Sequence, residues 1–129
     1  MKVLVTGVGG QLGYEVMKEL ARRGMDAVGA DKKEFDVTDA KETEHFISAC
    51  RPDAVVHCGA FTAVDKAETE RELCRAVNVD GTAHIAKVCA EIGAKMVYIS
   101  TDYVFDGTGT DFHKPDDPTA PLNFYGLTK

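Results

Sequence analysis

The hydrophobic pattern of the chain consists of short apolar runs that are separated by longer amphipathic segments. The runs lie at residues 2–6, 26–31, 54–58 and 95–100, and glycine or polar residues end each of them. Short apolar runs that are bounded by turn-forming residues are typical of buried strands. The pattern therefore predicts four strands.

The segments between these runs have the period of helices. Apolar residues recur three or four positions apart at 11–23, 39–50 and 79–92, and Gly24 and Gly93 follow the first and the third segment. An apolar stripe of this period is typical of a helix that packs one face on a core, and glycine is a common residue just after a helix end. We expect three helices here.

The remaining segments have weaker patterns. Residues 64–77 are polar and interrupted, and they indicate a short helix that runs toward the next one. Residues 103–123 hold three of the four prolines, which predicts a long loop. Residues 124–129 have the composition of the first turns of a further helix.

Strands that alternate with helices predict right-handed crossovers and a parallel sheet. We expect an α/β protein of the Rossmann type, with a doubly wound parallel sheet in the strand order 3-2-1-4. This arrangement is the first half of the full fold. The 129 residues suit one domain, 1–129, and no linker divides them.

Composition narrows the function classes. The net charge is −6, which argues against nonspecific nucleic-acid binding because that needs a basic face. No apolar run is long enough to span a membrane, and the histidines have no metal-ligand spacing. The four cysteines are too far apart for a C-x-x-C pair, and they are typical of reduced thiols in a cytoplasmic protein.

A glycine pattern follows the first predicted strand and opens the first predicted helix. Gly7, Gly10 and Gly13 form G-x-x-G-x-x-G. In a dinucleotide-binding loop, the first glycine permits the tight turn, the second admits the pyrophosphate, and the third lets helix and strand pack closely. Asp31 ends the second predicted strand, near the spacing expected for an acid that binds ribose hydroxyls. The pattern predicts a dinucleotide cofactor.

The same segment leaves the choice of cofactor open. The carboxylate of Asp31 favours NADH, because it repels a 2′-phosphate. Lys32 and Lys33 follow directly and would attract that phosphate. NADH and NADPH therefore both remain candidates.

Tyr125 and Lys129 are four residues apart at the start of the last predicted helix, which places them on one face. Reduction of a carbonyl needs a proton donor for the forming alkoxide, and a nearby ammonium lowers the pKa of a tyrosine toward the working range. Ser100 and Thr101 end the fourth predicted strand, where a hydroxyl would hold the substrate oxygen. Together these residues indicate ketone reduction.

Several motifs resemble those of the extended short-chain dehydrogenase/reductase family, and within it the branch of dTDP-4-dehydrorhamnose reductases. The runs T-A-V-D-K-A-E at 62–68 and S-T-D-Y-V-F-D-G at 100–107 are specific to that branch, whereas the glycine loop and Y-x-x-x-K mark only the superfamily. The segment C-G-A-F-T at 58–62 departs from the more usual N-A-A-Y-T, so Cys58 and Phe61 are expected to change the polarity of the pocket.

The resemblance implies roles for individual residues. Thr101 would orient the substrate, Tyr125 would donate the proton and Lys129 would be its partner. The residues expected to bind the cofactor are Gly7, Gly9, Gly10, Gln11, Leu12, Gly13, Asp31, Lys32, Asp36, Val37, Ala60, Thr62, Tyr103, Tyr125 and Lys129. Those expected to contact the substrate are Thr101, Asp102, Val104 and Phe105.

The activity that the resemblance implies is reduction, by NADPH or NADH, of the C4 ketone of dTDP-4-dehydro-L-rhamnose to dTDP-L-rhamnose, for cell-surface polysaccharides. A sugar-nucleotide epimerase or dehydratase of the same superfamily, or a non-catalytic regulatory subunit that binds NAD(P), are the alternatives. Family members are roughly twice as long, so we expect 1–129 to be an incomplete Rossmann domain without the C-terminal sugar-nucleotide part, and inactive alone. A homodimer is a further expectation.

Overall fold

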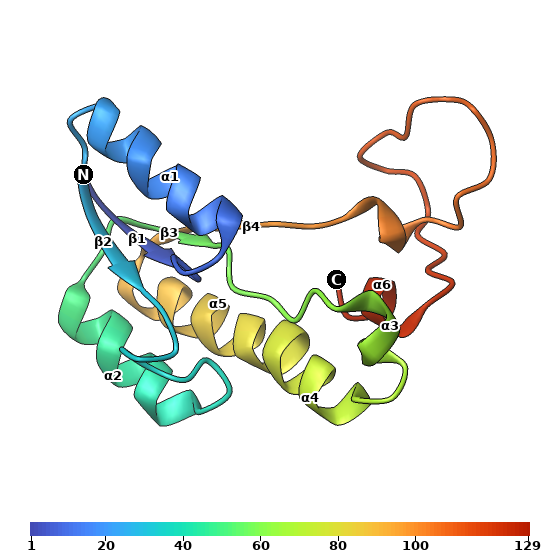
Figure 1. Ribbon diagram of the computed structural model, residues 1–129. Helices are drawn as coiled ribbons and strands as arrows, with labels where there is room; N and C mark the ends of the chain where they lie inside the picture. Colours follow the sequence, from blue (N-terminus) through green and yellow to red (C-terminus); the bar gives the residue numbers. More distant parts are fainter.

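Four parallel strands form the centre of the molecule. The computed structural model describes residues 1–129, and its sheet has the order β2-β1-β3-β4 (Figure 1). The strands are β1 (Lys2–Thr6), β2 (Asp26–Ala30), β3 (Ala54–His57) and β4 (Lys95–Tyr98). All four predicted strands are therefore present, and the Rossmann-type parallel sheet is confirmed.

The structure corrects the expected strand order of 3-2-1-4, because β3 lies beside β1 and not beyond β2. Val3 is paired with Ala54. Asp53 secures the start of β3 next to β1, since its backbone N–H donates to the carbonyl oxygen of Lys2 at 2.9 Å and its carboxylate accepts the Lys2 N–H at 2.6 Å. These bonds fix β3 on the side of β1 that β2 leaves free.

Helices cover both faces of the sheet. α1 (Gln11–Arg22) lies on one face, whereas α2 (Ala40–Cys50) and α5 (Gly81–Ile92) lie side by side on the other (Figure 1). Right-handed crossovers require this change of face, because the chain moves from β1 to β2 in one direction and then back across β1 to β3. The main core lies between the sheet and the α2–α5 pair, and its buried residues include Leu4, Ile47, Val55 and Ile85.

A long helical segment leads into α5. It begins with α4 (Arg71–Arg75), continues through the π-helical turn η1 (Ala76–Asp80) and enters α5 without interruption. Three short helices complete the fold: α3 (Val64–Ala67), the 3₁₀ turn η2 (Asp102–Val104) and α6 (Phe124–Leu127). A second, smaller core joins α3, α4 and α6 through Ala67, Cys74 and Tyr125.

The change of face defines where a ligand can bind. The loops that follow β1 and β3 diverge to opposite faces, and in open α/β sheets such a divergence opens a crevice at the carboxyl ends of the strands.

No helix of the chain is both long enough and apolar enough to cross a membrane.

Candidate functional site

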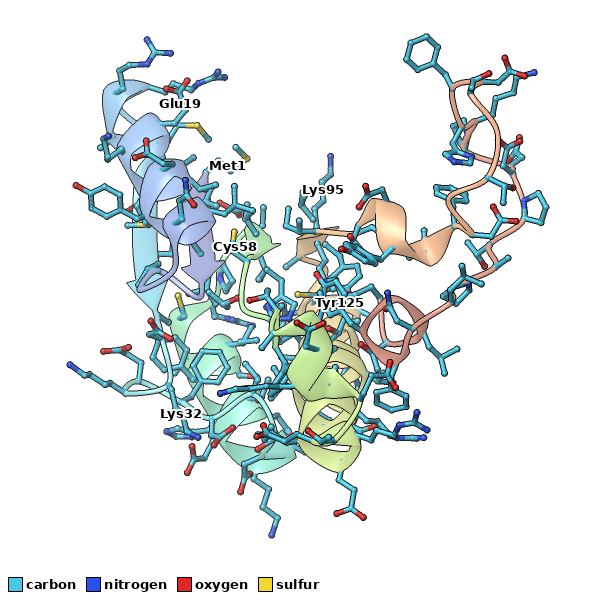
Figure 2. All side chains as sticks on the ribbon, turned by 45° about the vertical axis from the view of Figure 1, so that its right-hand side comes forward. Met1, Glu19, Lys32, Cys58, Lys95 and Tyr125 are labelled. Atoms are coloured by element: carbon cyan, nitrogen blue, oxygen red, sulfur yellow. The ribbon has the colours of Figure 1, made fainter.

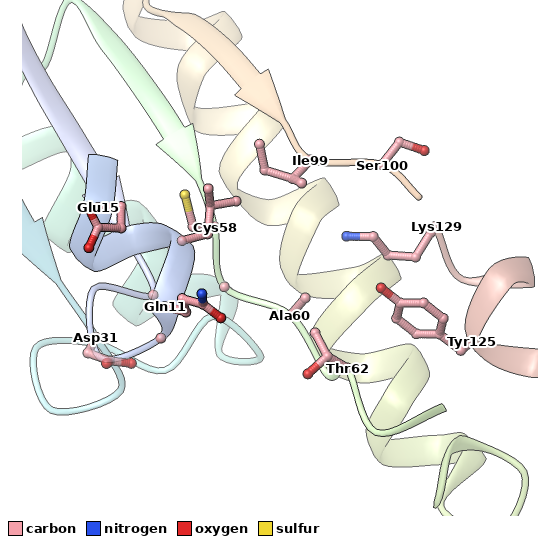
Figure 3. A pocket seen from close by; sticks show the side chains of 14 residues that line it. Gln11, Glu15, Asp31, Cys58, Ala60, Thr62, Ile99, Ser100, Tyr125 and Lys129 are labelled. Atoms are coloured by element: carbon pink, nitrogen blue, oxygen red, sulfur yellow. The ribbon is translucent and has the colours of Figure 1, made fainter. Parts of the chain in front are cut away.

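A cavity of about 630 Å³ lies in this crevice (Figure 3). Its walls come from the glycine loop, the segments after β3 and β4, and α6. The lining residues are Gly7, Gly10, Gln11, Leu12, Glu15, Asp31, Cys58, Gly59, Ala60, Thr62, Ile99, Ser100, Tyr125 and Lys129. Nine of the residues expected to bind the cofactor therefore lie around one cavity.

The glycine loop has the close packing that its sequence predicts. Gly7 has a φ of +72°, and a Cβ on Gly13 would collide with the carbonyl oxygen of Gly7. Gly10 lies at the N-terminus of α1, where no side chain caps the helix. The free N–H groups of the first turn therefore face a cavity lined by Gln11 and Leu12, and they suit the pyrophosphate of a dinucleotide.

Asp31 closes the loop from the end of β2. One oxygen of its carboxylate accepts a hydrogen bond from the Gly9 N–H at 2.8 Å, and the other accepts one from the Lys32 N–H at 2.9 Å. The Nζ of Lys32 is 3.4 Å from the carboxylate of Asp36. Lys32 is therefore turned toward Asp36, while the Asp31 carboxylate is fixed against the loop.

A second cavity of about 270 Å³ adjoins the first at Asp31, and Phe35, Val37, Leu73 and Val77 are among its walls. The apolar side chains in these walls could pack on the faces of a flat ring. Asp36 lies at its edge and accepts two hydrogen bonds from Thr38, which lower the pKa of its carboxyl. Asp36 and Val37, which the resemblance implies as adenine contacts, both line this cavity.

Tyr125 is buried on α6, and burial raises the pKa of its phenol while the Thr101 hydroxyl acts in the opposite direction. α6 is fixed at its start by Asn123, whose side chain accepts the Gly126 N–H at 2.7 Å, and by Glu68, which accepts the Phe124 N–H at 2.7 Å. Because Gly126 has no side chain, α6 packs directly on the carbonyl oxygen of Tyr103. This contact places Tyr125 next to η2.

Lys129 and Tyr125 direct their end groups into the same cavity (Figure 3). The Nζ of Lys129 lies over the ring of Tyr98, 4.3 Å from its centroid, and burial lowers the pKa of the ammonium. Both side chains line one cavity, but α6 ends at Leu127, so Lys129 lies beyond the helix and not on one helical face with Tyr125. The expected decrease in the pKa of Tyr125 is wrong for this structure, because burial is its largest influence and the ammonium is engaged with Tyr98.

The residues expected to contact the substrate lie mainly outside this cavity. The hydroxyl of Thr101 donates to Asp102 at 3.1 Å and accepts the Tyr103 N–H at 3.3 Å, so it caps η2. The ring of Tyr103 meets that of Tyr125 edge-on at 5.8 Å. Asp102, Tyr103 and Phe105 line a separate cavity of about 270 Å³. Ser100, rather than Thr101, lines the main cavity, and Val104 lines none of the three cavities.

Two buried polar residues at the site are missing from the expected set. Asn78, on the π turn, bonds both to the backbone of Phe61 and to Thr128. His57, at the end of β3, has its Nδ1 2.6 Å from the hydroxyl oxygen of Thr6. Cys58, the residue after His57, lines the main cavity, and burial raises the pKa of its thiol.

Figure 2 shows Cys58 and Tyr125 near the middle of the molecule, whereas Lys32 lies toward its edge.

The sequence could have predicted that His57 and Gly59 lie near the site, because residues at the carboxyl end of a parallel strand lie at the ligand-binding edge of the sheet. The role of Asn78 could not be predicted in this way, since its partner Thr128 is distant in the sequence.

Taken together, the site offers free helix N–H groups for a pyrophosphate, an apolar cavity beside an acidic residue, and a tyrosine with a lysine nearby. This arrangement can bind a dinucleotide and donate a proton beside it.

Comparison with known proteins agrees with this chemistry. The family described as RmlD substrate binding domain matches residues 1–129. A dTDP-4-dehydrorhamnose reductase from Streptomyces griseus is 43% identical over 126 residues, which is 98% of this chain and 41% of that protein. The methionine adenosyltransferase 2 subunit beta of Pongo abelii is 38% identical over 99% of this chain and 40% of its own length.

A solved structure supports the same comparison. The dTDP-4-dehydrorhamnose reductase from Bacillus anthracis, in complex with NADP, has a TM-score of 0.94 and 38% identity over 98% of this chain and 45% of that one. This chain therefore spans less than half of the length of the relatives that it matches.

Proposed function

The chain belongs to the RmlD substrate-binding-domain family, and from this premise we propose that it carries the cofactor-binding and proton-donating part of an NAD(P)H-dependent reductase. The proposed reaction reduces the C4 ketone of dTDP-4-dehydro-L-rhamnose to an alcohol. The observation that carries the proposal is that Tyr125 and Lys129 point into the same cavity as the glycine loop (Figure 3).

The nicotinamide ring, when bound, supplies the hydride that adds to the C4 carbon. Tyr125 then donates its phenolic proton to the carbonyl oxygen, so that the ketone gains one hydride and one proton and becomes the alcohol. The phenol of Tyr125 is protonated at neutral pH and so has a proton to donate, but burial raises its pKa and makes it a weaker acid, so the transfer depends on stabilisation of the phenolate.

Two neighbours assist the proton transfer. The ammonium of Lys129 lies in the same cavity, where it stabilises the phenolate that Tyr125 leaves behind. The hydroxyl of Thr101 is close enough to Tyr125 to lower its pKa, and this supports our proposal that Thr101 orients the substrate oxygen. Asp102, Val104 and Phe105 lie on the adjoining segment and are proposed to contact the dTDP-sugar.

The adenosine part of the cofactor is proposed to lie in the second cavity. Phe35 and Val37 would pack on the base, and Asp31 would meet the ribose. Both NADH and NADPH are included in the proposal, and the structural relative from Bacillus anthracis contains NADP. The proposed setting is the cytoplasm, and homodimerisation remains a prediction.

The test is a cofactor-oxidation assay on the complete protein that carries this sequence, with dTDP-4-dehydro-L-rhamnose as substrate. We expect stoichiometric oxidation of NADPH or NADH, and loss of turnover with retained cofactor binding in Tyr125→Phe. An epimerase would regenerate its cofactor and give no net oxidation. Tyr125→Phe with undiminished turnover would refute the assignment.

A non-catalytic regulatory subunit is the second candidate, because the methionine adenosyltransferase 2 subunit beta matches nearly the whole chain. The presence of Thr101, Tyr125 and Lys129 together in the sequence argues for the enzyme instead. Cofactor binding without any turnover in the unaltered protein would favour the regulatory subunit.

A further inference from the structure

Two rings on neighbouring strands and the lysine after α6 form a stack at the edge of the candidate site. The ammonium of Lys129, after α6, lies 4.3 Å from the ring centroid of Tyr98 on β4. On β3, the ring of His57 is stacked on Tyr98, with centroids 6.0 Å apart and an interplanar angle of 24°. The cation therefore rests on an aromatic ring that has a second ring beside it.

His57 is the buried member of the stack. Its side chain is 1% exposed, its Nδ1 bonds to Thr6, and its Nε2 has no protein partner. Burial, followed by the charge of Lys129, lowers the pKa of His57 to about 4. The ring is therefore neutral at physiological pH and does not repel the ammonium.

Among residues 1–129, no carboxylate lies within ion-pair distance of Lys129. A carboxylate would hold the ammonium in a directed hydrogen bond and would compete with any anion that forms nearby. The face of an aromatic ring attracts a cation without fixing the direction of its N–H groups. The ammonium on Tyr98 is thus held in the cavity while its donors stay available to Tyr125.

We propose that Tyr98 and His57 are positioning residues for Lys129, and that they form a neutral aromatic cradle from which the ammonium turns toward Tyr125. The functional role of the cradle rests on the proposed reductase function, in which Lys129 stabilises the phenolate of Tyr125. The geometry of the cradle does not depend on activity, and it can be measured separately.

The first test is the NMR spectrum of the complete protein, labelled with ¹³C at the lysine ε-carbons and assigned with Lys129→Arg. The ring current of Tyr98 is expected to move the Lys129 ε-methylene protons upfield. Tyr98→Phe, which keeps the ring, retains this shift, and Tyr98→Leu abolishes it and lowers the pKa of Lys129 further. An upfield shift that survives in Tyr98→Leu would overturn the proposal.

The second test measures turnover of the same variants after circular dichroism has shown that they are folded. Loss of the ring is expected to lower kcat about tenfold in Tyr98→Leu, with a smaller change in KM for the cofactor, and Tyr98→Phe recovers most of the rate. His57→Leu, which removes the neighbouring ring, weakens the upfield shift of Lys129. Equal rates in Tyr98→Leu and Tyr98→Phe would contradict the positioning role.

The outcomes separate this proposal from the reductase assignment. If the unaltered protein does not reduce the ketone but the upfield shift is present and depends on the Tyr98 ring, the cradle stands and the reductase function fails. If the protein is active and the shift is absent, the cradle fails and the reductase function stands.

Discussion

The side-chain amide of Asn78 donates a hydrogen bond to the hydroxyl of Thr128 at 2.9 Å. The same amide group accepts the Phe61 N–H at 2.7 Å and donates to the Phe61 carbonyl oxygen at 3.1 Å. Thr128 in turn donates to the carbonyl oxygen of Tyr125 at 2.7 Å. One buried side chain on a π-helical turn therefore joins the loop after β3 to the helix that carries the candidate proton donor.

Replacing Asn78 is expected to loosen this junction. Asn78→Leu has a similar branched shape but leaves the part-buried N–H and carbonyl groups of Phe61 without this partner, and an unpaired buried group costs about 1–3 kcal/mol. We expect the free energy of unfolding in urea to fall by about 3 kcal/mol, with a lower kcat in the complete protein because Tyr125 is less well placed.

Thr128→Val is the matched control, because it removes the bonds of the Thr128 hydroxyl to Asn78 and to the Tyr125 carbonyl oxygen but leaves both bonds between Asn78 and Phe61 in place. Its expected cost is about 1 kcal/mol. If Asn78→Leu destabilised the protein no more than Thr128→Val, the bonds to Phe61 would not be important for stability.

The strands and the longer helices follow from the sequence pattern because each is a local signal. Continuous apolar runs predict β1 and β3, and apolar residues with a helical period predict α1 and α5. Strand order is different, since it depends on which edge of β1 the chain returns to. The bonds between Lys2 and Asp53 that settle this edge join residues that are far apart in the sequence.

The site divides in the same way. The glycine loop and Asp31 are predictable, because the motif specifies a local turn and the end of an adjacent strand. The contact between Lys129 and Tyr98 is not predictable, since it joins a residue after α6 to a strand residue and depends on how α6 packs against α3 and η2. The separation of Phe105 from the main cavity likewise depends on the path of the loop after η2, which no periodic pattern describes.

Two glycines of the loop are expected to respond differently to alanine. A Cβ on Gly13 would collide with backbone atoms of Gly7, whereas the nearest atom to a Cβ on Gly10 is 3.4 Å away. Gly13→Ala should lower the free energy of unfolding by about 2–3 kcal/mol. Gly10→Ala should leave stability nearly unchanged and weaken cofactor binding in calorimetry, because its methyl group occupies the space for the pyrophosphate. Similar stability losses in both variants would contradict this reading of the loop.

The charge of Asp31 is expected to set the preference between the two cofactors. Its carboxylate is fixed by the Gly9 N–H at the join of the two cavities, where a 2′-phosphate would meet like charge. Asp31→Asn should therefore raise the affinity for NADPH relative to NADH by about tenfold, which corresponds to about 1.4 kcal/mol. The ratio of the two dissociation constants measures the effect.

Glu34→Gln is the control for Asp31→Asn. Glu34 lies in the same turn, and its carboxylate accepts the Asp31 N–H at 2.7 Å, but it lines neither cavity. It should change the ratio much less. Equal changes in the two variants would mean that the general charge of the turn, and not the position of Asp31, sets the preference.

The buried imidazole of His57 is expected to make stability fall in mild acid. Its pKa is about 4 in the folded protein and near 6.5 when exposed, so between these values the unfolded chain binds a proton that the folded chain does not. The free energy of unfolding should therefore decrease by about 2 kcal/mol from pH 7.5 to pH 5. Glu19, with a pKa of about 2, stays ionised in the folded protein throughout this range, and its exposed carboxylate contributes little to the decrease. In urea titrations, His57→Asn should remove most of this slope, and an unchanged slope would show that another group causes it.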